Sequence, residues 1–172
     1  DTPMLHVLRL SPAEVFDHTT EGIGADDLEH LSVDGEADLY TIRKITPHYL
    51  RVGYTGGSVE LRRFPAADGS ALIAALTTNG RARTLELWTL KALHAAPVKA
   101  ELPSMLPRLS WADFYRRPRA DDESLVLDYA LNENSEGIIA LAVPANLDRP
   151  PGHRQIFLWN GYGFINRSLP HE

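Results

Sequence analysis

The sequence contains no cysteine, and this absence removes several kinds of chemistry together. Disulfide bonds, thiolate metal sites and cysteine nucleophiles are all excluded. The 7 histidines are scattered and lack the HExxH spacing that places two metal ligands on one face of a helix. The sequence therefore predicts neither a transition-metal site nor a metal cofactor.

Motifs that bind phosphate or activate serine are also missing. No GxGxxG, P-loop or GxSxG pattern occurs in the chain, so neither a nucleotide cofactor nor a serine nucleophile is indicated. We therefore predict no cofactor, and we identify no catalytic residue. Carboxylate pairs of the kind that hydrolyse glycosides stay open, because such pairs meet in space and leave no mark in the sequence.

Positive charge is in short supply, since 17 Lys and Arg face 23 Asp and Glu, a net charge of −6. Nucleic-acid binders need a basic surface to displace counterions from phosphates, so a nucleic-acid partner is not expected. No apolar run approaches the roughly 18 residues of a membrane span. With 44% hydrophobic residues in 172, the chain is expected to form one globular domain over residues 1–172.

Strand patterns dominate what is present. Alternating apolar and polar residues, rich in β-branched and aromatic types, recur in short segments separated by TGG, ADG and NG turns. Asn79-Gly80 is the strongest hairpin signal, and we place these two residues at the centre of a two-residue turn. The expected strands form two groups, about 39–90 and 125–166: LYTIRKI, HYLRVGY, SVELRRF, ALIAALTT and RTLELWTL, then SLVLDYAL, GIIALAV, RQIFLW and GYGFIN.

Two short helices are predicted from capping residues. Ser11, followed by proline and a glutamate at the third position, indicates a helix over about 11–20. Ser110, with Asp113 at the third position, indicates a second helix over about 110–117. A connector with several prolines precedes the second helix and joins the two strand groups.

These elements predict an α+β fold made mainly of antiparallel sheet. The two meander-like strand groups are expected to form a sandwich or a partly open barrel. Weak likeness between the groups, such as TLELWTL beside QIFLWNG, leaves an internal duplication open against independent strand patterning.

The segment IFLWNGYGFIN, residues 156–166, reads as a closed hairpin with Asn160-Gly161 in a type I′ turn. Cross-strand packing is the simplest role for its aromatic rings, ahead of a ligand platform. We expect Trp88 and Trp159 to be mostly buried. Trp111 is expected to be partly exposed and is the first place to look for a ligand.

Two further sets of charged residues are candidates for binding. Asp34, Glu36 and Asp38 alternate in VDGEAD and are candidate calcium ligands, although their spacing lacks the twelve-residue loop signature and a solvated loop is the simpler interpretation. Arg51 and Arg62 lie on adjacent predicted strands and, with Trp111, form a candidate ligand or partner surface. The alternative for these arginines is the solvent side of a half-buried sheet.

The run from Ala37 to Leu90, with its core TPHYLRVGYTGGSVELRRF, resembles a family of small exported bacterial proteins known only as a domain of unknown function. The later WNGYGF resembles that family's closing hairpin, whereas His48 stands where the family has an acidic residue. The resemblance implies export to the periplasm or cell surface and no assigned activity. The start at Asp1 fits a removed signal peptide or a shortened chain.

The sequence therefore favours a non-catalytic binding or interaction module of the bacterial cell envelope, with an unknown protein or glycan as ligand. The competing hypothesis is an exported hydrolase that acts on carbohydrate or peptide through carboxylates. Two facing carboxylates in a cleft would favour the enzyme, and an exposed apolar patch or sheet face would favour the binder.

Overall fold

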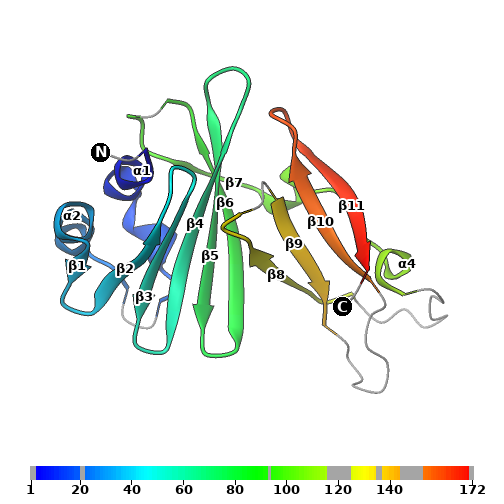
Figure 1. Cartoon of the computed structure of the whole chain (residues 1–172), viewed down its shortest axis with the longest axis horizontal. Coiled ribbons are helices and arrows are strands. Elements are labelled where there is room, and N and C mark those ends of the chain that lie inside the picture. Colours follow the sequence, from blue (N-terminus) through cyan, green and yellow to red (C-terminus); the bar gives the residue numbers. More distant parts are fainter. Residues whose placement is uncertain are drawn as a thin grey trace. The chain divides into compact units, whose positions relative to one another are not determined.

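A computed structural model describes residues 3–19, 22–92, 94–115, 125–134, 137–143 and 153–170. The chain divides into two compact units, Asp1–Glu101 and Leu102–Glu172. Each unit contains one antiparallel meander sheet, as Figure 1 shows, so the prediction of a mainly antiparallel fold with two strand groups is confirmed. The assignment of residues 1–172 to one domain stays a prediction, and so does the packing of the two sheets as a sandwich.

The first unit holds a seven-stranded sheet whose strands follow one another in sequence order. The five strands predicted for this region are all present as β2 to β6. Short strands that were not predicted flank them at both edges. The strands are β1 (Glu36–Ala37), β2 (Tyr40–Ile45), β3 (Tyr49–Tyr54), β4 (Gly57–Pro65), β5 (Ala71–Asn79), β6 (Ala82–Leu90) and β7 (Val98–Ala100).

The core of the first unit lies between one face of this sheet and the N-terminal helices. Leu50, Val52, Leu61 and Ile73 point to that face and are almost fully buried. Strand β5 is buried at every position from Ala71 to Thr77, which explains why its sequence is a continuous apolar run and does not alternate.

The N-terminal region begins with a helix that the sequence reading missed. Helix α1 (Pro3–Leu10) buries Met4, Val7 and Leu8 at helical spacing. Ser11 ends this helix, because its hydroxyl donates a hydrogen bond to the Val7 carbonyl 2.6 Å away. The predicted helix over 11–20 is therefore wrong in its start: a single 3₁₀ turn, η1 (Ala13–Phe16), follows, and Thr20 lies outside the described residues.

The acidic stretch before the first sheet contains a second helix that the sequence does not predict. Helix α2 (Ala25–Asp34) buries Leu28 and Leu31 against the core. The backbone N–H of Gly24 donates to the Asp27 carboxylate at 3.0 Å, which caps the first turn. Gly35 ends the helix with φ of 74°, a left-handed conformation that glycine adopts without strain.

The hairpin at Asn79-Gly80 is confirmed, with a register that differs by one residue. Asn79 pairs with Ala82 in the ladder, so Gly80 and Arg81 form the two-residue loop. Gly80 has φ of 59°. Glycine at the first loop position with positive φ is the arrangement of a type II′ turn, which suits the twist of the flanking strands.

The connector after β6 is compatible with its prolines, because its one strand, β7, is short and lies at the sheet edge. The second unit follows with two short helices and a four-stranded sheet in the order β11-β10-β9-β8. Its elements are α3 (Leu102–Met105), α4 (Trp111–Phe114), β8 (Leu127–Leu131), β9 (Gly137–Ala142), β10 (His153–Trp159) and β11 (Phe164–Pro170).

Helix α4 begins as predicted. The backbone N–H of Ser110 donates to the Asp113 carboxylate at 2.7 Å, which satisfies a donor at the helix start. The helix ends at Phe114, whereas residues 116 and 117 of the predicted range lie outside the described residues. None of the helices in the described part of the chain is both long and apolar enough to cross a bilayer.

Candidate functional site

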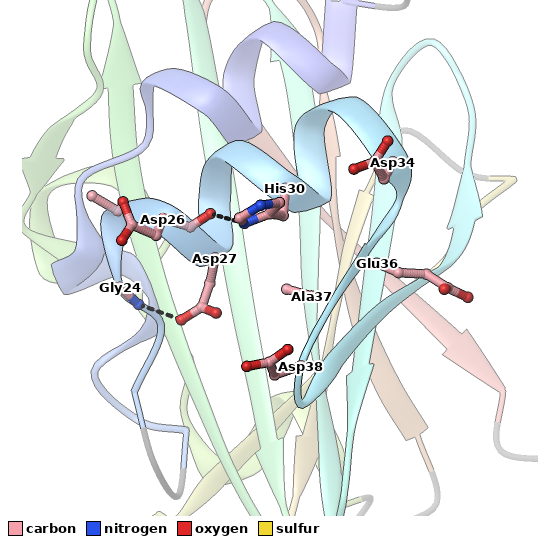
Figure 2. A pocket seen from close by; sticks show the side chains of 9 residues that line it. Gly24, Asp26, Asp27, His30, Asp34, Glu36, Ala37 and Asp38 are labelled. Carbon is pink, nitrogen blue, oxygen red and sulfur yellow. Dashed lines mark hydrogen bonds between the residues drawn. The ribbon is translucent and has the colours of Figure 1, made fainter.

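The first unit has an acidic hollow beside helix α2, shown in Figure 2. It measures about 960 Å³ and is lined mainly by carboxylates together with His30. The backbone around it comes from the helix and from the β1 region that follows Gly35. The acidic residues on its wall are Asp26, Asp27, Asp34, Glu36 and Asp38.

The hollow contains the three residues considered as calcium ligands, but their carboxylates do not converge. Figure 2 shows Glu36 extending away from both Asp34 and Asp38. Across the described ranges, no three His, Asp or Glu side chains lie close enough together to hold a metal ion. The hollow therefore concentrates negative charge without offering a ready coordination sphere.

The other candidates from the sequence lie in different units. Arg51 is exposed on β3, whereas Arg62 on β4 is 5% exposed and lies 6.0 Å from the centre of the Phe64 ring. Trp111 is half-buried in α4, where its ring packs 5.2 Å from that of Tyr115. The ligand-binding role given to these three residues stays a prediction.

The hairpin of β10 and β11 differs from its prediction at the turn. Trp159 pairs with Phe164, so the loop has four residues, 160–163, and the predicted two-residue type I′ turn is wrong. The side-chain oxygen of Asn160 accepts hydrogen bonds from the backbone N–H groups of Tyr162 and Gly163, each at 2.9 Å. This side-chain bonding holds the wider loop and lifts Tyr162 out of the strand.

The end of this hairpin is an aromatic tip, defined here as Trp159, Tyr162 and Phe164. The Trp159 and Phe164 rings meet edge to face with centres 5.1 Å apart, as a cross-strand pair. Both are only partly exposed, so the prediction that Trp159 is mostly buried agrees with the structure, and that for Trp88, 5% exposed, is confirmed. Tyr162 is 84% exposed. The tip therefore combines a packed pair with one ring in solvent.

The two faces of the four-stranded sheet differ in burial. One face carries Ile138, Ala140 and Phe157, all at most 1% exposed. On the same face the Gln155 side chain donates to the carbonyl of Asp113, which fixes α4 to β10. This face is the core side of the second unit.

The opposite face, called the open face below, is aliphatic where a solvent side is ordinarily polar. Ile165 is 55% exposed and pairs directly with half-buried Leu158. Arg167 is exposed two positions along β11. The other side chains on this face in β9, β10 and β11 are Ile139, Leu141, Arg154, Ile156 and Leu169.

From the sequence alone, the C-terminal hairpin is expected to serve in packing, and Trp111 is the first candidate for a ligand contact. The available signal was the NGYG sequence, which has glycines on both sides of the tyrosine. Two glycines permit a longer loop as readily as a strand start, so Tyr162 had to be considered as a loop residue.

Comparisons with known proteins identify the fold alone. No family model matches the sequence, and no curated protein matches it. The structure is similar to that of a domain of an uncharacterized protein from Porphyromonas gingivalis W83, with a TM-score of 0.67 and 13% sequence identity. The likeness covers 96% of this chain and 98% of that domain. A distant neighbour of this kind is compatible with the resemblance to exported proteins of unknown function but does not establish that family.

Proposed function

We propose that this protein is a non-catalytic binding module whose partner is another protein, bound through the open face and the aromatic tip. The observation that supports the proposal is the exposure of Ile165 and Tyr162, 55% and 84%, beside a row of half-buried aliphatic side chains. Apolar surface of this kind costs free energy in water, and burial against a partner recovers about 25 cal/mol per Å².

The residue types also favour a protein partner. Tyrosine, tryptophan and arginine supply most of the binding energy in protein interfaces, and aliphatic residues fill the space around them. The open face carries Arg167 and Ile165, and Tyr162 projects from the loop of the same hairpin, whereas Trp159 lies on the core side of the sheet. A glycan partner would use the aromatic rings but would gain little from the aliphatic row.

The competing hydrolase requires two facing carboxylates in one cleft. Among the described residues of the open face, Asp128 is the one carboxylate, and it accepts a hydrogen bond from the Tyr129 backbone at 2.9 Å. In the acidic hollow of the first unit, Glu36 extends away from Asp34 and Asp38. We therefore place binding ahead of hydrolysis.

We also propose that the protein works outside the bacterial cytoplasm. The support for this part is the resemblance of residues 37–90 and of WNGYGF to exported bacterial proteins. Fractionation of the source bacterium, followed by detection with an antibody against this chain, tests it. Recovery in the periplasmic or surface fraction is expected, and recovery with cytoplasmic markers would refute it.

A binding selection tests the proposed activity without knowledge of the partner. The purified chain is used to select from a display library of random peptides and is applied in parallel to a glycan array. Ile165→Asp removes the exposed aliphatic side chain, and Val98→Asp is the matched control. Val98 is 57% exposed on β7, an edge strand of the other unit.

The expected result is a set of enriched peptides that bind the native chain and the Val98→Asp variant but not Ile165→Asp. Loss of one well-placed apolar contact weakens binding by about tenfold or more. Binding to glycans alone, or peptide binding that Ile165→Asp leaves unchanged, would overturn the proposal. Hydrolysis of a bound peptide or glycan would restore the enzyme hypothesis.

A further inference from the structure

Strand β11 is a long and regular sheet edge. It pairs with β10 without interruption from Phe164 to Pro170, over 7 residues, and no other described strand pairs with its outer side. Proteins usually protect such an edge by shortening it, bending it with a bulge or placing charges along it. Here the ladder has no bulge, and its protective features are the exposed Arg167 and Pro170 at the last position.

One hydrogen bond in the loop determines which backbone groups of β11 face away from β10. The N–H of Asn160 donates to the carbonyl of Gly163 at 3.1 Å. In an antiparallel ladder this makes the adjacent Trp159–Phe164 pair a non-hydrogen-bonded one, and the pattern alternates along the strand. Asn166 and Ser168 therefore direct their backbone N–H and C=O groups away from β10, toward the edge.

The hairpin is also a basic segment in an acidic chain. The chain has a net charge of −6, yet residues 153–170 contain two arginines, one histidine and no aspartate or glutamate. Arg154 and Arg167 lie on the open face at diagonal positions, because Ile156, two residues from Arg154, pairs directly with Arg167. The edge therefore presents positive charge to whatever approaches it.

One of these arginines lacks a partner where it is buried. The Nε atom of Arg154 is shielded from solvent and makes no hydrogen bond within the described residues. The side-chain oxygen of Asn166, on the edge strand itself, is in the same condition. The indole Nε1 of Trp88 in the first unit is in the same condition, so these atoms do not by themselves mark the hairpin as incomplete, and the inference rests on the edge geometry and the charge.

We propose that β11 accepts an extended acidic segment of a partner protein as a fifth strand of this sheet. The inference rests on the proposed function and specifies its partner. Backbone groups of Asn166 and Ser168 bond the incoming strand, and side chains above the open face select it. Because Ile165 and Arg167 are two positions apart on one face, the segment carries an apolar residue and an acidic residue two positions apart.

A designed peptide tests this assignment on the whole chain. The probe has about ten residues, a typical strand length or slightly more, with valine and glutamate two positions apart in a threonine-rich background. One control peptide has lysine in place of glutamate. The second carries N-methyl groups on alternate backbone amides, which removes strand pairing and keeps every side chain. Binding is measured by calorimetry, and amide hydrogen exchange is measured at Asn166 and Ser168.

Two protein variants show whether binding depends on the charge of the edge strand or on a general effect of charge reversal on the protein. Arg167→Glu reverses the charge on the edge strand, and Arg81→Glu makes the same change at an exposed turn of the other unit. Arg167→Glu is expected to weaken binding of the glutamate peptide by about tenfold or more and to strengthen binding of the lysine peptide. The Arg81→Glu variant is expected to bind both peptides with the same affinity as the native chain. N-methylation is expected to weaken binding by about tenfold or more, because several backbone hydrogen bonds are lost together.

Protection of the Asn166 and Ser168 amides by the glutamate peptide, together with the charge exchange, supports strand addition. If display-selected peptides bind in an Ile165-dependent way but tolerate N-methylation and leave those amides unprotected, strand addition is refuted while the proposed function stands. If no peptide binds this face, both are refuted. Protection that rises with protein concentration without peptide would identify a second copy as the occupant and overturn the acidic-segment proposal.

Discussion

The two sheets of this protein differ in the length of their edge strands. In the seven-stranded sheet, the edge strands β1 and β7 have only 2 and 3 residues. In the four-stranded sheet, the edge strands β8 and β11 have 5 and 7 residues. Short edges discourage pairing with another chain, whereas long ones permit it. The outermost strands of the first unit therefore offer little length for pairing with another chain, whereas β11 of the second unit offers 7 residues.

The faces of the two sheets show the same contrast. In the first unit, α1, η1 and α2 cover one face and form a core with Leu8, Phe16 and Leu31 almost fully buried. In the second unit, the open face keeps Ile165 and Arg167 exposed. The difference separates a part that supplies stability from a part that is available for recognition.

The largest expected effect is a loss of stability when a buried tryptophan of the first unit is replaced, compared with the same replacement in the second unit. Trp88→Ala removes a ring that is 5% exposed in the core of the first unit, and it should lower the free energy of unfolding by about 3 to 5 kcal/mol. Trp159→Ala, at the half-buried tip, should cost about half as much or less. Urea denaturation measures both. Equal losses would mean that the tip is as much a packing core as the first unit.

The two hairpin turns provide the next comparison. Gly80 and Gly161 have φ of 59° and 93°, where a β-branched residue is strained. Gly80→Val and Gly161→Val should therefore each lower the free energy of unfolding by about 1 kcal/mol or more. Thermal or chemical unfolding of both variants measures this. An unchanged midpoint in either one would contradict the positive φ at that turn.

A smaller effect should come from Glu86 in the first unit, and it depends on pH. Burial opposes ionisation of Glu86, but hydrogen bonds from Lys99 at 2.8 Å and His18 at 3.0 Å outweigh it and lower its pKa below 4.5. Because the folded pKa is the lower one, ionised Glu86 stabilises the fold above about pH 4.5. That stabilisation is lost as the pH falls through the folded value.

The measurement compares the native chain with Glu86→Gln at several pH values. The native chain should be the more stable of the two near neutrality, and the difference should shrink as the pH falls below about 4.5. A difference that stays constant from neutral to acidic pH would show that the three side chains do not interact as described. Lys99→Met should reduce the effect, since it removes the nearer donor.

The smallest expected effect is at the open face and the aromatic tip. Ile165→Ser and Tyr162→Ser change residues that are 55% and 84% exposed, so each should alter the free energy of unfolding by no more than about 0.5 kcal/mol. Phe157→Ser, on the core side of the same hairpin and 1% exposed, should cost several times as much. A large loss at Ile165 would make it a packing residue and weaken the contrast between the two faces.

The strands were predictable because alternation and turn glycines are local signals. The segments LYTIRKI to RTLELWTL appear as β2 to β6 with small changes at their ends. The helices were harder. Met4, Val7 and Leu8 carry a helical period in only 8 residues, and Ser11-Pro12 imitates the start of a helix where the structure has the end of one.

The candidate site was less predictable, because it depends on long-range pairing. Which face of β10 is buried follows from its partners β9 and β11 and from the Gln155 contact with Asp113, and these residues are far apart in the sequence. The wider loop at Tyr162 depends on a side-chain bond of Asn160 that competes with the two-residue turn. Arg154 and Arg167 become neighbours only once this register is set.

The most direct test of the recognition surface is a backbone amide chemical-shift map of the whole chain with a display-selected peptide. We predict that the changes fall within residues 158–169 and are absent from the short edges Glu36–Ala37 and Val98–Ala100. Changes centred on helix α2 and its acidic hollow, with the β10–β11 hairpin unaffected, would contradict the account.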